Sequence, residues 1–231
     1  MKVFTIITSF LLCIISFQVS GQNGYHFGIK AGPTIANQTW NNSERRVALT
    51  YHFTGFVETL DPEERGSLYA QLGLHNRGSS VGISNFRSRW NYNFKNIALE
   101  LGARRILDQE MLGARPYYSV GIRGEYNVTN NLEEITQGFQ EIIFNNPNLN
   151  NGSFTIEDPV FLNKFVYGIS IGGGLQFYGS EFFNTAVELR VSPDIGFQYD
   201  RVVSANSSTQ IRNVSVEISL VLRFLREVIY E

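Results

Sequence analysis

The stretch VSVEISLVLRF, from Val214 to Phe224, alternates apolar and polar side chains. Its even positions are all apolar, and its odd positions are polar except for Val221. This period of two excludes an amphipathic helix, because a helix would scatter the apolar side chains around its axis. A tilted strand needs roughly ten residues to cross a bilayer, whereas strands of soluble proteins average roughly five or six. The stretch therefore predicts a membrane-spanning β-strand with one apolar and one polar face.

Other segments repeat this alternation and predict further strands. The complete set of expected strands is 25–31, 49–60, 68–74, 90–101, 115–126, 165–177, 187–191 and 214–224. A change of parity near Lys95 and Asn96 predicts a β-bulge. We expect Pro33 to end the first strand, since proline cannot donate to a ladder, and we expect residues 37–46 and 193–212 to be loops. The repeated strand pattern predicts an all-β fold, an eight-stranded antiparallel up-and-down transmembrane β-barrel. Because the number of strands is even, we expect both termini on the periplasmic side.

The start of the chain resembles a secretory signal peptide. Lys2 precedes an apolar run from Val3 to Phe17, and small residues follow before an expected cut ahead of Gln22. The run is shorter than the roughly 20 residues of a membrane-spanning helix, which is the alternative. We therefore expect a signal peptide at 1–21 and an outer-membrane barrel domain at 22–231, located in the outer membrane of a Gram-negative cell. The only cysteine, Cys13, lies in the signal, so the mature chain would form no disulfide.

Charge and barrel size together predict the interior. The formal net charge is only -2 with 17% charged residues and no basic run, so a nucleic-acid partner is unsupported. In a barrel of about eight strands, side chains fill the lumen, which argues against a general diffusion porin. Charges on the inward face must then be paired. The predicted lumen network is Lys30, Glu58, Glu100, Arg123, Glu125, Glu188, Arg190, Glu217 and Arg223. Six tyrosines near strand ends suit the aromatic girdles of the two interfaces, namely Tyr25, Tyr51, Tyr92, Tyr118, Tyr126 and Tyr167.

All three histidines fall on inward positions. His52 and His75 are expected to lie opposite each other on neighbouring strands, while His26 lies toward the other end of the barrel. Two adjacent imidazoles could bind a metal, but no third ligand is evident in the sequence. We therefore expect polar filling of the lumen, with no metal and no cofactor.

The long segment between 127 and 164 holds one helical pattern. Ile135, Phe139, Ile142 and Ile143 follow acidic Glu133 and Glu134 at helical spacing, which predicts a short amphipathic helix. Such a helix either packs on the barrel rim or serves as a loop that docks a partner.

Several strings resemble a known family. They are GIKAGPTIANQTW (28–40), SLYAQLGLHNRG (67–78), RPYYSVGIRG (115–124) and VELRVS (187–192). Across nearly the whole mature chain these resemble the PorT-type outer-membrane β-barrel proteins of the Bacteroidetes. The chain departs from that family at Gln71, where a glutamate is usual, and at Glu231, which follows Tyr230 where the family commonly ends in an aromatic residue. The resemblance implies a barrel and an association with secretion across the outer membrane.

These patterns favour a non-enzymatic protein of the outer membrane. We expect a structural, binding or envelope-assembly component, associated with secretion, that acts through its extracellular loops. The expected partners are outer-membrane lipids, the barrel-assembly machinery and envelope or secretion proteins. A lipid-modifying outer-membrane enzyme on the same scaffold is the alternative, although no spacing of serine, histidine and acid singles out a nucleophile. A soluble periplasmic β-sandwich is a third possibility, and it would require protein to cover the apolar faces.

Overall fold

The computed structural model describes residues 24–40, 46–59, 66–82, 89–111, 113–135, 137, 162–180, 183–204 and 207–227. The expected signal peptide and three residues of the expected helix, Phe139, Ile142 and Ile143, lie outside these ranges. The strands are β1 (Gly24–Trp40), β2 (Ala48–Thr59), β3 (Gly66–Gly82), β4 (Arg89–Ile106), β5 (Ala114–Asn130), β6 (Phe165–Tyr178), β7 (Phe183–Pro193), β8 (Tyr199–Ser204) and β9 (Ser207–Glu227). None of the described segments is a helix long and apolar enough to cross a membrane.

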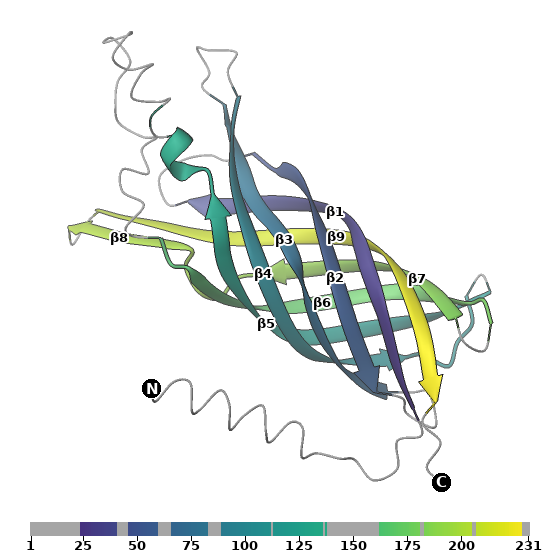
Figure 1. Ribbon diagram of the computed structural model, residues 1–231. Coiled ribbons are helices and arrows are strands. Elements are labelled where there is room, and N and C mark those ends of the chain that lie inside the picture. The colour runs from purple at the N-terminus through teal and green to yellow at the C-terminus, as the bar shows by residue number, and fades with distance from the viewer. Residues whose placement is uncertain are drawn as a thin grey trace, which may run out of the picture.

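Consecutive strands pair antiparallel from β1 to β7, and β9 pairs with both β7 and β1. The seam between the first and last strands is long, running from Gly24 opposite Glu227 to Trp40 opposite Ile211. β8 pairs with β9 and, with the adjoining part of β9, projects beyond the barrel (Figure 1). Within the described ranges the sheet is thus a closed, eight-stranded up-and-down barrel with one additional hairpin strand, which confirms the expected fold class.

The alternation sorts side chains to opposite sides of the barrel wall. In β9, Leu220 is 59% exposed on the outside while Glu217 is 1% exposed on the inside. On the outside of β5, Ile122 is likewise 67% exposed. An apolar belt of this kind is stable only against hydrocarbon, because apolar surface is unfavourable in water. Because no described protein segment covers the belt, the barrel is a membrane protein and the sandwich alternative is wrong.

The two ends of the barrel differ in their connections. β1 begins and β9 ends at one end, where the short connections 60–65, 107–113 and 179–182 also lie. We call this the inner end, and the opposite one, with the long connection 131–164, the outer end. Outer-membrane barrels place their short turns in the periplasm, so the inner end faces the periplasm.

Several strands run further than the sequence pattern predicted. β1 does not end at Pro33 but continues to Trp40. Pro33 pairs with Tyr51 of β2, and the ladder to β9 only omits Gly32 and Pro33 before it resumes at Thr34 in the same register. The missing N–H therefore removes one local contact on one side, and the neighbouring strands hold the rest of β1 in place. The expected loop at 37–46 is accordingly wrong for residues 37–40.

The expected loop at 193–212 is also wrong in part. Residues Tyr199–Ser204 form β8, which pairs with the first residues of β9. β3 likewise continues past the expected end at Leu74 to Gly82, and residues 75–80 are buried. The β-bulge is confirmed, because the register of β4 against β5 shifts between Lys95 and Asn96.

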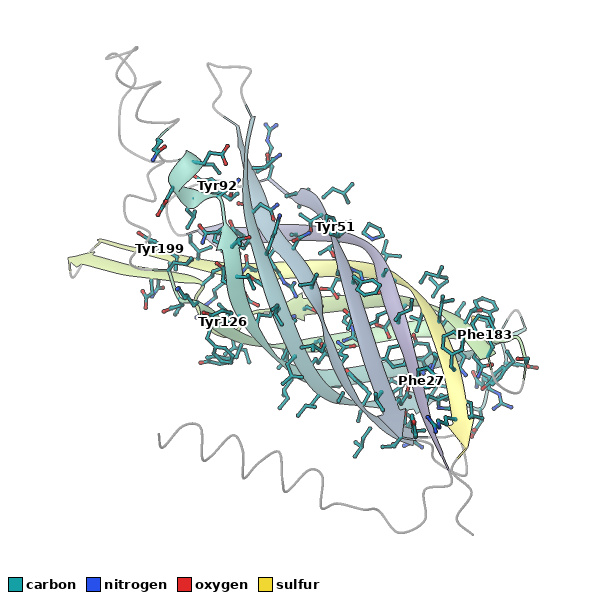
Figure 2. All side chains as sticks on the ribbon, in the orientation of Figure 1. Phe27, Tyr51, Tyr92, Tyr126, Phe183 and Tyr199 are labelled. Atoms are coloured by element: carbon teal, nitrogen blue, oxygen red, sulfur yellow. The ribbon has the colours of Figure 1, made fainter. Side chains whose placement is uncertain are left out.

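Aromatic residues mark both ends of the apolar belt (Figure 2). Tyr51, Tyr118, Tyr126 and Tyr167 are exposed on the outside of the barrel, and Tyr25 is half-buried. At the inner end the Phe27 and Phe183 rings both contact that of Phe224, at centroid distances of 5.6 and 5.3 Å. The girdle prediction is wrong for Tyr92, because this residue is 2% exposed and packs inside the outer end.

Candidate functional site

The lumen holds every charged residue that the sequence pattern placed there. All nine are at most 5% exposed, and all point away from the apolar belt: Lys30, Glu58, Glu100, Arg123, Glu125, Glu188, Arg190, Glu217 and Arg223. Each of them has at least one partner of opposite charge within the lumen. Paired in this way, the charges avoid the several kcal/mol that an isolated buried ion costs.

The charges near the inner end form one cluster. Glu58 accepts a hydrogen bond from Nη2 of Arg223 at 2.5 Å and lies 3.3 Å from Nη1 of Arg104. Glu188 joins Lys30 at 3.1 Å and Arg190 at 2.9 Å, and Arg190 also pairs with Glu100. We call these seven residues the inner cluster.

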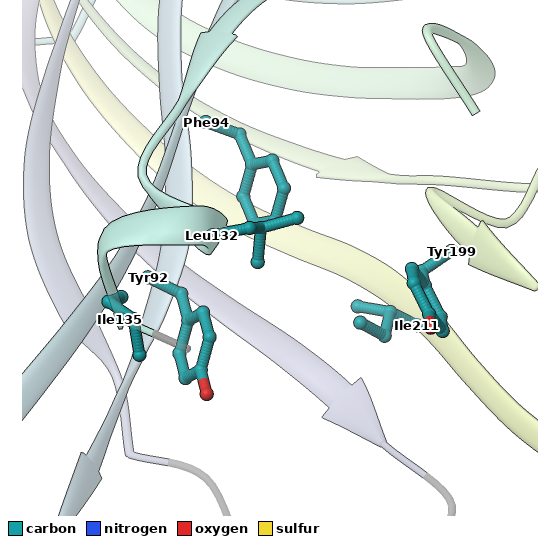
Figure 3. Packing of buried hydrophobic residues seen from close by; sticks show 6 residues of the cluster. All are labelled: Tyr92, Phe94, Leu132, Ile135, Tyr199 and Ile211. Carbon is teal, nitrogen blue, oxygen red and sulfur yellow. The ribbon is translucent and has the colours of Figure 1, made fainter. Parts of the chain in front are cut away.

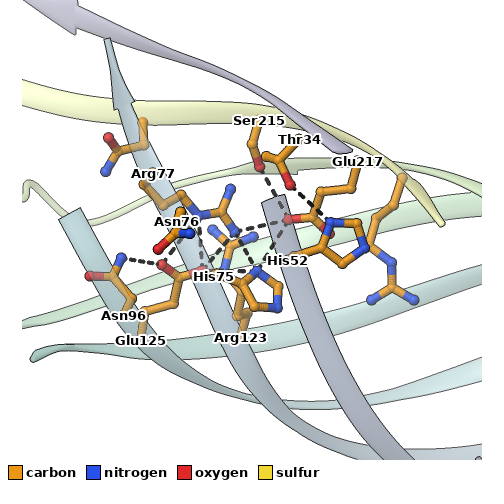
Figure 4. A network of polar contacts seen from close by, with 12 residues as sticks. Thr34, His52, His75, Asn76, Arg77, Asn96, Arg123, Glu125, Ser215 and Glu217 are labelled. Carbon is orange, nitrogen blue, oxygen red and sulfur yellow. Dashed lines mark hydrogen bonds and ion pairs between the residues drawn. The ribbon is translucent and has the colours of Figure 1, made fainter. Parts of the chain in front are cut away.

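A second cluster, the outer cluster, surrounds Arg77 of β3 (Figure 4). Its Nη2 lies 2.6 Å from Glu125 and 3.3 Å from Glu217. Arg123 contacts Glu125 at 2.8 Å through Nε and Asp194 at 2.6 Å through Nη2. Because Arg77 is fully buried, its charge is balanced entirely by groups inside the barrel.

Three members of these clusters were missed by sequence reasoning: Arg77, Arg104 and Asp194. Each lies beyond the end of an expected strand, yet each keeps the inward parity of that strand. Arg77 follows His75 by two positions, Arg104 follows Glu100 by four, and Asp194 follows Arg190 by four. Extending the alternation past the last apolar residue would have found all three.

The histidines take part in this polar packing. His52 and His75 are direct partners across β2 and β3, as expected, with ring centroids 5.9 Å apart. His52 lies 2.9 Å from Oγ1 of Thr34 and 2.8 Å from Oγ of Ser219. His75 Nδ1 lies 3.2 Å from Glu217.

His26 is half-buried near the inner end, away from the other two histidines. Within the described ranges, no group of three or more His, Cys, Asp or Glu side chains is arranged to hold a metal ion.

An apolar cluster lies above the polar network at the outer end (Figure 3). Its buried members are Tyr92, Phe94, Leu132, Ile135, Tyr199 and Ile211. Leu132 and Ile135 come from the short helical segment 132–135, Tyr92 and Phe94 from β4, and the remaining two from the β8–β9 hairpin. We call this cluster the outer cap. It brings Ile135 of the expected helix onto the rim, while Glu133 and Glu134 remain exposed.

Two small cavities lie in the inner part of the lumen. One has His26, Ser67, Gln176, Asn184 and the Glu58–Arg223 pair among its lining residues. The second shares Glu58 and Arg223 with it and extends to Lys30 and Arg190. The charges of the inner cluster therefore border space that side chains do not fill.

Comparison with known proteins bears on the fold. No protein-family model and no curated protein matches the chain. Among solved structures, Neisserial surface protein A is similar with a TM-score of 0.50 at 12% identity, over 89% of this chain and 99% of that one.

Two further structures are similar at lower scores. OprG from Pseudomonas aeruginosa has a TM-score of 0.44 at 10% identity over 88% of this chain and 98% of that one. Outer Membrane Protein W of E. coli has a TM-score of 0.40 at 11% identity over 88% and 99%. This chain has a closed barrel, an apolar belt and paired interior charges, and it shares the fold of Neisserial surface protein A. It is therefore a small eight-stranded outer-membrane β-barrel protein.

Proposed function

We propose that this barrel is a non-enzymatic binding or assembly component of the outer membrane, and that it acts through the structures at its outer end. The observation that carries the proposal is the outer cap. Leu132 and Ile135 are 1% and 3% exposed, so the start of the long connection is fixed to the barrel rather than free above it. A start that is fixed in this way suits recognition of a partner at the outer end.

The filled lumen supports the same proposal, because it argues against the main alternative function of a barrel, a channel for solutes. Arg77 is fully buried, joined to two carboxylates and paired across β3 and β4 with Phe94 of the outer cap. Passage of a solute would require these ion pairs to separate, which costs several kcal/mol for each charge left unpaired. The outside of the molecule, and not a channel, is therefore the surface we assign to function.

The resemblance to PorT-type proteins refines the proposal to a component associated with envelope assembly or secretion. Its partners would be outer-membrane lipids around the belt, the barrel-assembly machinery that inserts it, and envelope or secretion proteins at the outer end. The support is the four matching strings, all of which include residues of the barrel wall such as Lys30, Gln71, Arg123 and Arg190.

The test is replacement of residues 131–164 by a short glycine-containing turn in the native host. The matched control replaces the inner-end connection 107–113 in the same way. We expect both variants to keep the heat-modifiable gel mobility of a folded barrel. Only the outer variant should lose secretion or envelope integrity and the capture of envelope proteins by cross-linking. An outer variant that behaves as the wild type in both assays would overturn the proposal.

One observation favours the enzymatic alternative, a lipid-modifying barrel. Nε2 of His75 lies 3.4 Å from Oγ1 of Thr54, and its Nδ1 lies 3.2 Å from Glu217, so a hydroxyl, an imidazole and a carboxylate are in sequence. Against it, His75 is 3% exposed in the lumen, away from the apolar belt where a lipid would lie. Purified protein in mixed micelles should leave lipid A and phospholipids unchanged by mass spectrometry. A modification that disappears in H75Q would favour the enzyme instead.

A further inference from the structure

The inner cluster carries more positive than negative charge. Of the described buried side chains, it has four cations, Lys30, Arg104, Arg190 and Arg223, against three carboxylates, Glu58, Glu100 and Glu188. The outer cluster has the reverse imbalance, with Arg77 and Arg123 against Glu125, Asp194 and Glu217. Glu58 illustrates the shortage of anions, because it is shared between Arg104 and Arg223. The local field at the inner cluster therefore favours one additional anion.

The cavity beside this cluster is lined by hydrogen-bond donors that have no partner. Nε of Arg104, Nε of Arg223 and Oγ of Ser119 are buried and unbonded, and all three residues line the second cavity. The three residues are 7%, 2% and 2% exposed. An unbonded buried donor is unfavourable, so a group that accepts a hydrogen bond from these donors would be stabilised there.

The carboxylates on the cavity wall are already engaged. Glu58 is paired with two arginines, as described above, and Glu188 is bonded to Lys30 and Arg190 and accepts from the Tyr117 hydroxyl at 3.1 Å. Gln71 is the neutral amide on the same wall and is 5% exposed. The wall thus combines surplus positive charge, free donors and carboxylates whose charge is already compensated.

We propose that this inner-lumen cavity is a binding site for a small monovalent anion of the size of chloride, entered from the periplasmic end. Arg104, Arg223 and Ser119 donate to the anion, and Lys30 and Arg190 contribute charge from the deeper side. The adjoining cavity around His26 and Asn184 provides the approach, since the two cavities share Glu58 and Arg223. The bound anion neutralises the inner cluster and thereby stabilises the folded barrel.

A direct test uses the folded mature protein crystallised with sodium bromide, whose anomalous scattering locates the ion. We expect an anomalous peak inside the cavity, within hydrogen-bond distance of Arg104, Arg223 and Ser119. Bromide peaks found only on the protein surface would overturn the proposal.

A second test measures the temperature at which half of the protein loses its compact, fast-migrating form on SDS gels. Sodium chloride is compared with sodium gluconate at equal ionic strength, because gluconate is too large for the cavity. A ligand that binds only the folded state raises this temperature, and we expect chloride to raise it by about 2–4 °C. Equal temperatures in the two salts would contradict the proposal.

Gln71→Glu sharpens this test because it adds the missing negative charge within the cavity without changing the size of the side chain. Its chloride effect should fall below about 1 °C. The control is Gln38→Glu, which adds the same charge at a buried position near the outer cap, bonded to Asn213, and should keep the full effect. A Gln71→Glu protein with the full chloride effect would show that any stabilisation arises elsewhere.

Discussion

The outer and inner halves of the lumen are built on the same alternating strands but are filled differently. In the outer half, Arg77 joins Glu125 and Glu217, and its partner across β3 and β4 is Phe94 of the outer cap. In the inner half, the ion pairs of Glu58 and Glu188 border two cavities. The same wall therefore supports a buried ion-pair cluster next to an apolar cap at one end, and a charge cluster bordered by small cavities at the other.

The difference teaches that closure of a small barrel does not by itself decide whether its interior is sealed. Strand number sets the width, and the size and pairing of inward side chains set the packing. The extensions of β3, β4 and β9 past the belt add a further layer only at the outer end. Four tests by substitution, taken from the largest expected effect to the smallest, show whether this difference affects stability.

Arg77→Met should have the largest effect. It removes the fully buried cation that Glu125 and Glu217 share in the outer cluster. We expect a loss of about 3–5 kcal/mol in the free energy of unfolding, measured by urea titration of protein refolded into lipid vesicles. Arg226→Met, at an exposed position of β9, is the control and should change stability by less than about 0.5 kcal/mol. Similar losses in the free energy of unfolding of both variants would contradict a particular stabilising role of the outer cluster.

Phe94→Ala tests the cap. The Phe94 side chain is fully buried in the outer cap, so its truncation leaves a cavity and loosens Leu132 and its neighbours. We expect a loss of about 3 kcal/mol, together with faster proteolysis of the outer connections. Val128→Ala, on the exposed face of β5, should be close to neutral in both measurements. An unchanged rate of proteolysis in Phe94→Ala would show that the cap does not hold the outer connections in place.

Arg104→Met is the inner counterpart of Arg77→Met. Glu58 keeps Arg223 at 2.5 Å as its partner, and the adjoining cavity can admit water. We therefore expect a loss of only about 1–2 kcal/mol in the same urea titration. A loss equal to that of Arg77→Met would mean that the two halves are equally packed.

A pair of serine substitutions should show the smallest effects. Ser215 donates to Glu217 at 3.4 Å in the outer half, whereas Oγ of Ser119 in the inner half has no partner. In a medium without halide, Ser215→Ala should cost about 1 kcal/mol and Ser119→Ala less than about 0.5 kcal/mol. The reverse order in a urea titration would contradict the assignment of free donors to the inner cavity.

Much of the barrel could be predicted from local pattern. The bulge at Lys95 and Asn96 and the pairing of His52 with His75 followed from parity and turn position. Pro33 shows where such reasoning fails, because a proline that would end an isolated strand is held by β2 on one side and by the resumed ladder on the other. The pairing of β8 with β9 was missed because residues 199–204 and 207–211 carry no regular lipid-facing pattern.

By itself the sequence determined that each strand would have one apolar and one polar face, because a period of two places successive side chains on opposite sides. Only the tertiary structure decided which charges pair, which atoms stay unbonded and which charge cluster borders cavities. Lys30 meets Glu188, 158 positions away, and Arg223 meets Glu58, 165 positions away. Such contacts arise only when barrel closure brings β1, β2, β7 and β9 around a common centre, and no local pattern encodes the distances between them.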